Sequence, residues 1–204
     1  MRGRLREHFK KGPSVRWVTA VSASRPGPRT RPRGRDSQSR PRIRTLASAD
    51  RGEWVRLRSE LWPRSRVDFL SRDADALLRS HRAGRFRRNR MRATVFVAEL
   101  GHGKLVGFAE ADLRPYADGC RSSPVGYLEG WYVAPELRRT GIGSALVRAV
   151  EKWARDLGCT EMASDTETTN STSQLAHKSL GYTEVRRLAH FRRDLPVVKL
   201  KRET

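Results

Sequence analysis

Apolar residues recur along the chain with two different periods, and these periods predict its helices and strands. Between residues 54 and 61, and again between 67 and 80, they lie three or four positions apart, as in amphipathic helices. Residues 94–100 and 104–113 are instead rich in branched and aromatic side chains around a Gly-His-Gly turn, which predicts a β-hairpin. The buried side of the second helix is expected to comprise Phe69, Leu70, Ala74, Leu77 and Leu78.

The second half of the chain is arranged around a central strand. Leu128 to Val133 is predicted to form it, because the segment is aromatic and branched and Pro135 cannot donate to a β-ladder. The pattern then predicts a helix from about Ser144 to a cap at Gly158, a strand at 159–164, a helix capped by Asn170, and a last strand or hairpin from Tyr182 to Leu195. With a first strand near residues 43–46, this order predicts a single α/β or α+β domain in which helices flank a mixed sheet.

Basic residues are concentrated at the start of the chain. Residues 1–42 hold 13 of the 43 Lys and Arg residues and two acids, so +11 of the net charge of +21 lies there. This segment is rich in Pro, Gly and Ser, and we expect it to be disordered, with the domain at 43–195 and a short tail at 196–204. Contact with nucleic acid, contact with an anionic membrane surface and a role as a transit peptide stay open, but none has a motif, and a non-functional extension is favoured.

Other residue types argue against several classes of protein. No apolar run approaches the roughly 18 residues of a membrane span, and no signal-peptide core is present, so a cytoplasmic protein is expected. Cys120 and Cys159 form no Cys-x-x-Cys pair and the five histidines lack metal-ligand spacing, so no metal site is expected. The arginine-rich stretch 79–92 has a single aromatic residue, which favours a solvated linker over a nucleic-acid surface.

The segment between the central strand and the next helix has the composition of an anion-binding loop. Its sequence is Arg138, Arg139, Thr140, Gly141, Ile142, Gly143 and Ser144. The glycines leave backbone N–H groups unshielded, and with the positive end of the helix dipole these groups can converge on a phosphate. The run Arg-x-x-Gly-x-Gly is neither a P-loop nor a three-glycine dinucleotide fingerprint. It resembles the pyrophosphate loop of the GNAT acetyltransferase superfamily, which binds acetyl-CoA.

Two carboxylates are predicted to lie near this loop. Acetyl transfer to an amine needs the free base, and freeing an alkyl amine of pKa near 10.4 at pH 7 costs roughly 4 kcal/mol. A carboxylate can attract the ammonium group and accept its proton, directly or through water. Glu129 lies in the central strand and Asp165 follows the adjacent strand, so both should open on the same edge of the sheet. Gly130 beside Glu129 indicates a bulge or a close backbone approach there.

The resemblance becomes closer between Tyr116 and Tyr182. The runs Leu128-Glu129-Gly130, Glu161-Met162-Ala163-Ser164-Asp165-Thr166 and Leu180-Gly181-Tyr182, with Asn170, Ser173, Gln174 and His177, resemble the aminoglycoside 6'-N-acetyltransferases. This resemblance covers about residues 43–193 and implies a GNAT-like domain with a mixed, mostly antiparallel sheet. It also implies transfer of an acetyl group from acetyl-CoA to the 6'-amino group of an aminoglycoside, resistance to these antibiotics, and a homodimer.

The same resemblance implies roles for individual residues. Coenzyme contacts would come from Trp131, Tyr132, Val133, Arg138, Arg139, Thr140, Gly141, Ile142, Gly143, Ser144 and Asn170. Contacts with the aminoglycoside would come from Trp62, Ser65, Tyr116, Glu129 and Asp165, of which Glu129 and Asp165 would be catalytic.

Three departures from the family pattern bear on the acceptor. Ser65 stands where the family has a histidine, Arg186 where it has an acid, and Phe191 where it has a tyrosine. An arginine in the acceptor pocket would repel a polycationic substrate. Two other functions therefore stay open. One is a GNAT enzyme that acetylates another amine, on a protein or a small molecule, which Arg186 and the sequence pI of about 11.4 favour. The other is a nucleic-acid-binding protein that uses the arginine-rich tail, which would leave the glycine loop and both carboxylates idle.

Overall fold

One sheet organises the part of the chain that the structure describes. This computed structural model describes residues 41–82, 93–101 and 103–194. Within them the strands lie in sequence order as β1 (Arg42–Thr45), β2 (Ala93–Leu100), β3 (Lys104–Arg114), β4 (Val125–Val133) and β5 (Met162–Ser164). The first four are antiparallel, and β5 runs parallel to β4. The predicted mixed, mostly antiparallel sheet is confirmed.

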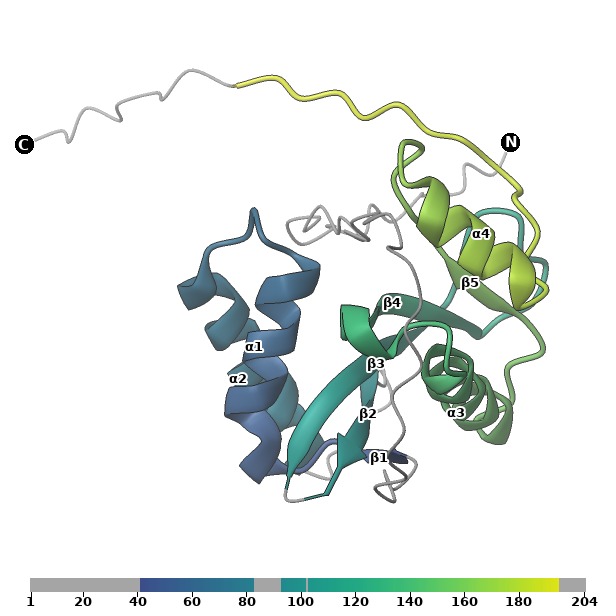
Figure 1. The fold of residues 1–204 in the computed structure, drawn as a ribbon. Helices are drawn as coiled ribbons and strands as arrows, with labels where there is room; N and C mark the ends of the chain where they lie inside the picture. Colours follow the sequence, from purple (N-terminus) through teal and green to yellow (C-terminus); the bar gives the residue numbers. More distant parts are fainter. Residues whose placement is uncertain (1–40, 83–92, 102, 195–204) are drawn as a thin grey trace, which may run out of the picture.

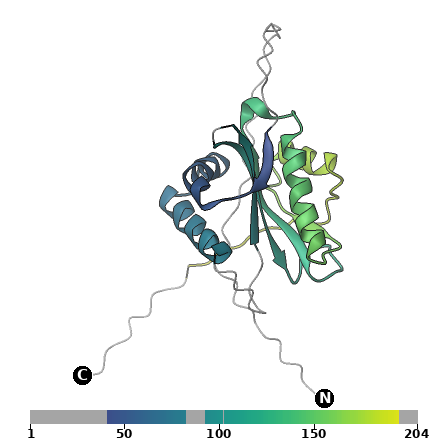
Figure 2. The same ribbon diagram turned by 90° about the horizontal axis from the view of Figure 1, so that it is seen from below.

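Helices cover both faces of this sheet (Figures 1 and 2). On one face lie α1 (Arg51–Leu61) and α2 (Val67–Arg82), and on the other lies α3 (Ile142–Asp156). The last helix, α4 (Ser171–Ser179), lies alongside β5. Two short 3₁₀ turns, η1 (Ser48–Asp50) and η2 (Pro135–Leu137), precede α1 and follow β4. The element order agrees with the sequence prediction as far as α4.

Each face of the sheet has its own hydrophobic core. The core under α1 and α2 includes the fully buried Trp54, Leu57 and Leu70. The core under α3 includes Leu146 and Val150, which lie one helical turn apart on the face that meets the sheet. Helix α3 begins two residues before the predicted Ser144, at Ile142. Its end is as predicted, because Gly158 follows the C-cap in the left-handed conformation at φ +89°.

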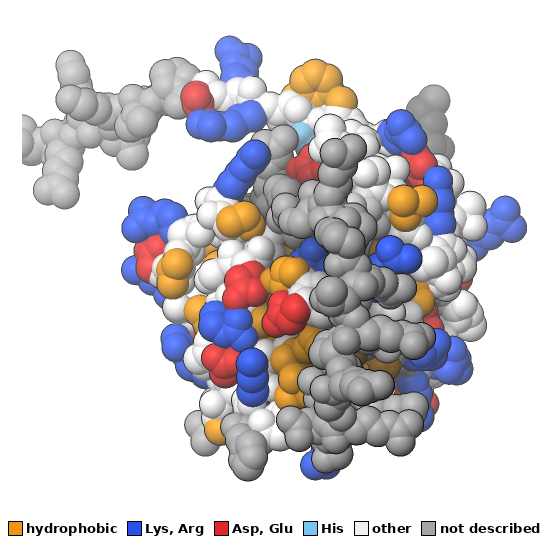
Figure 3. Space-filling view, in the orientation of Figure 1, with side chains coloured by type: hydrophobic (Ala, Val, Ile, Leu, Met, Phe, Trp, Pro, Cys, Tyr) orange, Lys and Arg blue, Asp and Glu red, His pale blue; other side chains and the backbone are white. Residues whose placement is uncertain are grey.

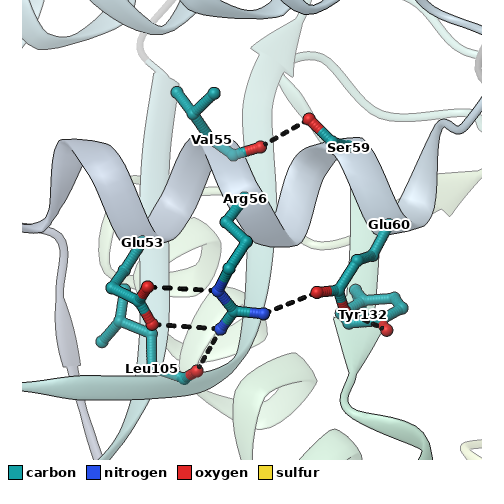
Figure 4. Close-up of polar contacts among 7 residues, drawn as sticks. All are labelled: Glu53, Val55, Arg56, Ser59, Glu60, Leu105 and Tyr132. Atoms are coloured by element: carbon teal, nitrogen blue, oxygen red, sulfur yellow. Dashed lines mark hydrogen bonds and ion pairs between the residues drawn. The ribbon is translucent and has the colours of Figure 1, made fainter.

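Helix α1 is tied to the sheet by polar contacts that Figure 4 shows. The Arg56 guanidinium contacts Glu53 and Glu60 on its own helix and donates to the carbonyl oxygen of Leu105 in β3, at 3.1 Å. Glu60 in turn accepts a 2.6 Å hydrogen bond from the hydroxyl of Tyr132 in β4. The Tyr132 side chain therefore faces α1, on the side of the sheet opposite α3.

Several sequence predictions are wrong in detail. The last strand predicted from Tyr182 to Leu195 is absent from the described residues 182–194, where Thr183 to Asp194 are exposed. The ion pairs of this segment join Arg187 to Glu184 and Arg192 to Asp194 within it, and Arg186 to Asp118 in the loop after β3. Phe69 is 39% exposed, because it lies one residue off the stripe that buries Leu70 and Ala74.

Other predictions differ in extent or fall outside the described residues. The strand predicted at 159–164 forms only over Met162–Ser164. Strand β4 begins at Val125, three residues before its predicted start at Leu128. The predictions for residues 1–40, for 83–92 of the arginine-rich stretch, and for 195–204 lie outside the described residues.

Basic side chains of the described residues are often paired with acids. On the visible face in Figure 3, Lys and Arg side chains lie beside Asp and Glu side chains. The ion pairs of Arg51 with Asp75 and of Lys152 with Asp156 are examples, with N–O distances of 2.5 and 2.6 Å. Across residues 41–82, 93–101 and 103–194, no helix combines the length and the apolar character that crossing a membrane requires.

Candidate active site

The loop between β4 and α3 presents backbone amides at the start of a helix. Gly141 and Arg139 adopt positive φ angles of 91° and 64°, which turn the chain sharply into α3. Among the described residues no side chain caps the first turn of α3, and this turn contains no acidic residue, so its N–H groups and the positive end of its dipole suit an anion. Arg138 is anchored beside this turn by a 2.9 Å hydrogen bond from its Nε to the Val133 carbonyl oxygen.

Gly143 allows the loop to lie against β4. A Cβ atom at Gly143 would be 2.8 Å from Cζ2 of Trp131, so a larger residue would displace the indole. The buried Nε1 of Trp131 and the buried Nδ2 of Asn170 have no hydrogen-bond partner within the described part of the chain. Asn170 uses its other amide atom, Oδ1, to cap α4 by accepting from the Ser173 amide at 3.0 Å. Two buried donors thus lack a partner among the described residues, and the Trp131 donor lies beside Gly143.

Strands β4 and β5 part at Leu128. Their parallel pairing ends with Leu128 opposite Ser164, whereas β4 continues to Val133. Side-chain contacts stabilise the two strands at the point where they separate. Ser164 Oγ lies 3.1 Å from the Leu128 carbonyl oxygen and 3.0 Å from Nε2 of His177. His177 donates through Nδ1 to the Ser173 carbonyl oxygen at 2.8 Å. Beyond this point β4 has an open edge that leads toward the glycine loop.

Glu129 lies at the opening, and the structure places a second acid beside it. The β3–β4 register shifts between Glu110 and Ala111, opposite Gly130 and Leu128, so Glu129 sits in the bulge that Gly130 predicted. Its carboxyl group meets Asp112 of β3 and the guanidinium of Arg114. Burial, and then the Asp112 charge, raise the pKa of Glu129 to about 8.

The aromatic ring of Tyr127 lies between this acid pair and Asp165. The Arg114 Cζ atom lies 3.3 Å from the ring centroid of Tyr127 in β4. The Tyr127 hydroxyl faces the Asp165 carboxylate, and burial together with this charge raises the pKa of Tyr127. Glu129 and Asp165 thus open on one part of the sheet, as the sequence predicted, with Tyr127 between them.

Comparison with known proteins places this geometry in a family. The acetyltransferase (GNAT) family matches residues 54–182. Aminoglycoside N(6')-acetyltransferase type 1 of Klebsiella aerogenes is 43% identical over 157 residues, which are 77% of this chain and 99% of that protein. The chain belongs to the aminoglycoside N(6')-acetyltransferases of the GNAT family. The corresponding protein of Stenotrophomonas maltophilia is 40% identical, over 77% of this chain and 95% of its own length.

Two solved structures of this acetyltransferase family agree with the fold. AAC(6')-Iy in complex with the bisubstrate analog CoA-S-monomethyl-acetylneamine is 35% identical, with a TM-score of 0.67 over 77% of this chain and all of that chain. AAC(6')-IG of Acinetobacter haemolyticus is 32% identical, with a TM-score of 0.66 over 76% of this chain and 99% of that chain. The GNAT-like fold predicted from the sequence is confirmed.

The remaining acceptor residues predicted for this acetyltransferase differ in their burial and in their contacts. Trp62 is 2% exposed and packs under Gly130, where a Cβ atom would be 2.8 Å from its ring. Ser65 is half-buried in the turn between α1 and α2, and its amide donates to the Trp62 carbonyl oxygen at 2.9 Å. Tyr116 is 65% exposed, and its hydroxyl donates to Asp118 at 2.8 Å. Arg186 contacts the same carboxylate at 3.2 Å.

Sequence reasoning missed Asp112, Arg114 and Tyr127. A signal for the first two was present, because Glu110, Asp112 and Arg114 alternate along β3 and therefore share one face of the sheet. Glu110 begins this charged row beneath α1, where it is buried with Arg58. Arg114 thus contacts Glu129 directly, whereas Arg186 pairs with Asp118 and lines a cavity together with Asp118 and Asp165.

Proposed function

We propose that this chain transfers the acetyl group of acetyl-CoA to the 6'-amino group of aminoglycosides. The observation that carries this proposal is the open edge of β4, which runs from the amide-rich loop at Gly141 to the buried acids at Glu129. The bisubstrate complex of AAC(6')-Iy, whose ligand joins CoA to an acetylated aminoglycoside fragment, supports both halves of the proposal.

The residues present fit coenzyme A. The first turn of α3, free of acids, suits the pyrophosphate, and the Arg138 and Arg139 side chains add positive charge beside it. Residues 129–133 of β4 offer main-chain groups along the edge that β5 leaves open, while the buried Trp131 and Asn170 donors supply further contacts. Tyr132 would contribute through its main chain, because its side chain is bound to Glu60. Acetyl-CoA, when bound, supplies the activated acetyl thioester.

Acetyl transfer also requires a deprotonated acceptor amine, and the acids of the site can bind the ammonium group and accept its proton. The pair Asp112 and Glu129 attracts the acceptor's ammonium group into a site where its charge is poorly screened, and the exposed Asp165 adds a further negative charge. Glu129 then accepts the proton, because its raised pKa of about 8 makes it a stronger base than an ordinary carboxylate. The buried face of Trp62 under Gly130 fixes the floor of this site, and the exposed ring of Tyr116 offers a surface for a cationic sugar.

The cellular setting follows from this chemistry. Acetylation removes a positive charge and a hydrogen-bond donor from the drug, so we propose a role in aminoglycoside resistance within the cytoplasm, where the ribosomal target lies. We also propose a homodimer. Exposed apolar side chains along the extended segment, Val185, Leu188 and Phe191, with 62%, 53% and 95% exposure, support a partner surface there.

A pair of aminoglycosides that differ only in an amine or a hydroxyl at the 6' position tests this function. Thiol release from acetyl-CoA by the purified full chain should be rapid with the 6'-amine and at least about 10²-fold slower with the 6'-hydroxyl compound, because the acids are placed for one ammonium group. Peptides and polyamines serve as alternative acceptors in the same assay. Equal rates with the two aminoglycosides, or turnover on peptides or polyamines alone, would refute the proposal.

A further inference from the structure

Arg114 occupies the position in which a substrate cation would be bound. Its Nη2 donates to Glu129 Oε1, its Nε lies 3.4 Å from Asp112 Oδ1, and its Cζ lies 3.3 Å from the centre of the Tyr127 ring. Two carboxylates over an aromatic face are the partners that an ammonium group prefers. In the free protein, the guanidinium of Arg114 therefore occupies the two acids, Glu129 and Asp112, that are proposed to bind the acceptor.

The acid pair has more acceptor capacity than Arg114 uses. Asp112 Oδ1 is buried and accepts no hydrogen bond from the described residues, since the Arg114 contact at 3.4 Å is an ion pair without hydrogen-bond geometry. Asp112 and Glu129 are 18% and 15% exposed at their side chains, so water screens them weakly. The Glu129 and Asp112 carboxyl groups hydrogen-bond each other and face one guanidinium, while Asp112 Oδ1 is left without a donor among the described residues, which is costly for a buried acceptor. A ligand with several N–H donors on a positive charge would relieve both deficits.

The guanidinium of Arg114 is also placed so that it can move away from Glu129 and Asp112. It is the last residue of β3, and its side chain is one-third exposed. Arg58 provides the contrast within the same domain, because its side chain is fully buried between α1, α2 and β3 and contacts Asp73 and Glu110. Because a third of its side chain already meets solvent, the Arg114 guanidinium has a path into water when another cation takes its place, whereas Arg58 has no such path.

We propose that Arg114 holds the ammonium site of the free protein closed, and that the acceptor binds by displacing its guanidinium from Glu129 and Asp112. This inference rests on the proposed function. Asp112 thereby becomes a further acceptor-binding residue, whose Oδ1 takes a hydrogen bond from the incoming ammonium group. Arg114 becomes a specificity residue, because only an acceptor with enough positive charge competes with it for the two carboxylates.

Calorimetric titration of kanamycin, an aminoglycoside with a 6'-amine, tests the displacement. Arg114→Met is expected to tighten kanamycin binding by about tenfold, because the internal competitor is gone. Arg155→Met, an equal change of charge on the exposed end of α3, should leave the Kd unchanged. Asp112→Asn should weaken kanamycin binding. In the double variant, Arg114→Met should increase kanamycin affinity less than it does in the parent, since the two changes act on one site. Titration of coenzyme A into each variant provides the check that the fold is intact.

The outcomes separate this inference from the proposed function. If the parent chain binds and acetylates kanamycin but Arg114→Met binds it equally or more weakly, Arg114 orients Glu129 and displacement is wrong. If Asp112→Asn binds kanamycin as the parent does, Asp112 is no part of the site and the inference also fails. A parent chain that binds coenzyme A but neither binds nor acetylates kanamycin would remove the proposed acceptor and this inference with it.

Discussion

Glu129→Gln should lower kcat/KM for the aminoglycoside by about 10²- to 10⁴-fold, the usual contribution of a general base. The substitution keeps the size of the side chain and a hydrogen-bonding group for Arg114, but the amide cannot accept the proton of the ammonium group. Steady-state rates at saturating acetyl-CoA measure the loss. The Kd of coenzyme A should be unchanged, because the glycine loop lies apart from this carboxylate.

The pH dependence provides a second test of Glu129. Its pKa is raised to about 8 by burial and by Asp112, so the carboxylate form that can act as a base appears as pH rises through this value. The kcat/KM of the parent should therefore rise with pH up to about 8, and Glu129→Gln should lose this limb. A variant that retains at least a third of the parental kcat/KM with the same pH profile would show that another group accepts the proton.

Glu110→Ala is expected to destabilise the fold by about 3–5 kcal/mol, the usual cost of breaking a buried ion pair. Glu110 is 5% exposed, accepts a 2.9 Å hydrogen bond from Trp54 Nε1, and lies 2.9 Å from Nε of the fully buried Arg58. Its removal leaves an indole N–H without an acceptor and a buried guanidinium with fewer partners. Urea unfolding at pH 7 measures the change in free energy of unfolding.

Two further variants define this stability effect. Glu110→Gln keeps an acceptor for Trp54 but removes the charge opposite Arg58, so its loss should be smaller than that of Glu110→Ala. Glu99→Ala removes the acid of an ion pair with Arg44 in which both side chains are about one-fifth exposed, and it should cost clearly less. Equal losses for Glu110→Ala and Glu99→Ala would contradict the account of a buried pair beneath the site.

The backbone features around the candidate site that local sequence determines agree with the sequence prediction. Gly141, Gly143 and Pro135 act on the backbone within a few residues, so the turn from β4 into α3 could be located from the sequence alone. Asn170 caps α4 by the same local chemistry. An acid inside an otherwise apolar strand marks Glu129 as a candidate, and Gly130 correctly indicates the bulge in which it lies.

The parts that depend on tertiary contacts were missed. The meeting of Asp112 with Glu129 requires the register of β3 against β4, including the shift at Glu110, and no local pattern supplies that register. The last strand was predicted wrongly because a strand needs an edge to pair with. Within the described residues β5 pairs over three positions only, while Val185, Leu188 and Phe191 recur every third residue and not in alternation.

The position of the acetyl group on the product tests the central claim most directly. Kanamycin should be converted to completion by the full chain with acetyl-CoA, and NMR of the purified product should then identify the modified nitrogen. A β4 edge that brings the thioester to Glu129, with acids placed for one ammonium group, predicts a single acetyl group on the 6'-nitrogen. An acetyl group on a different nitrogen, or no acetylated product from a chain that binds coenzyme A, would contradict the account.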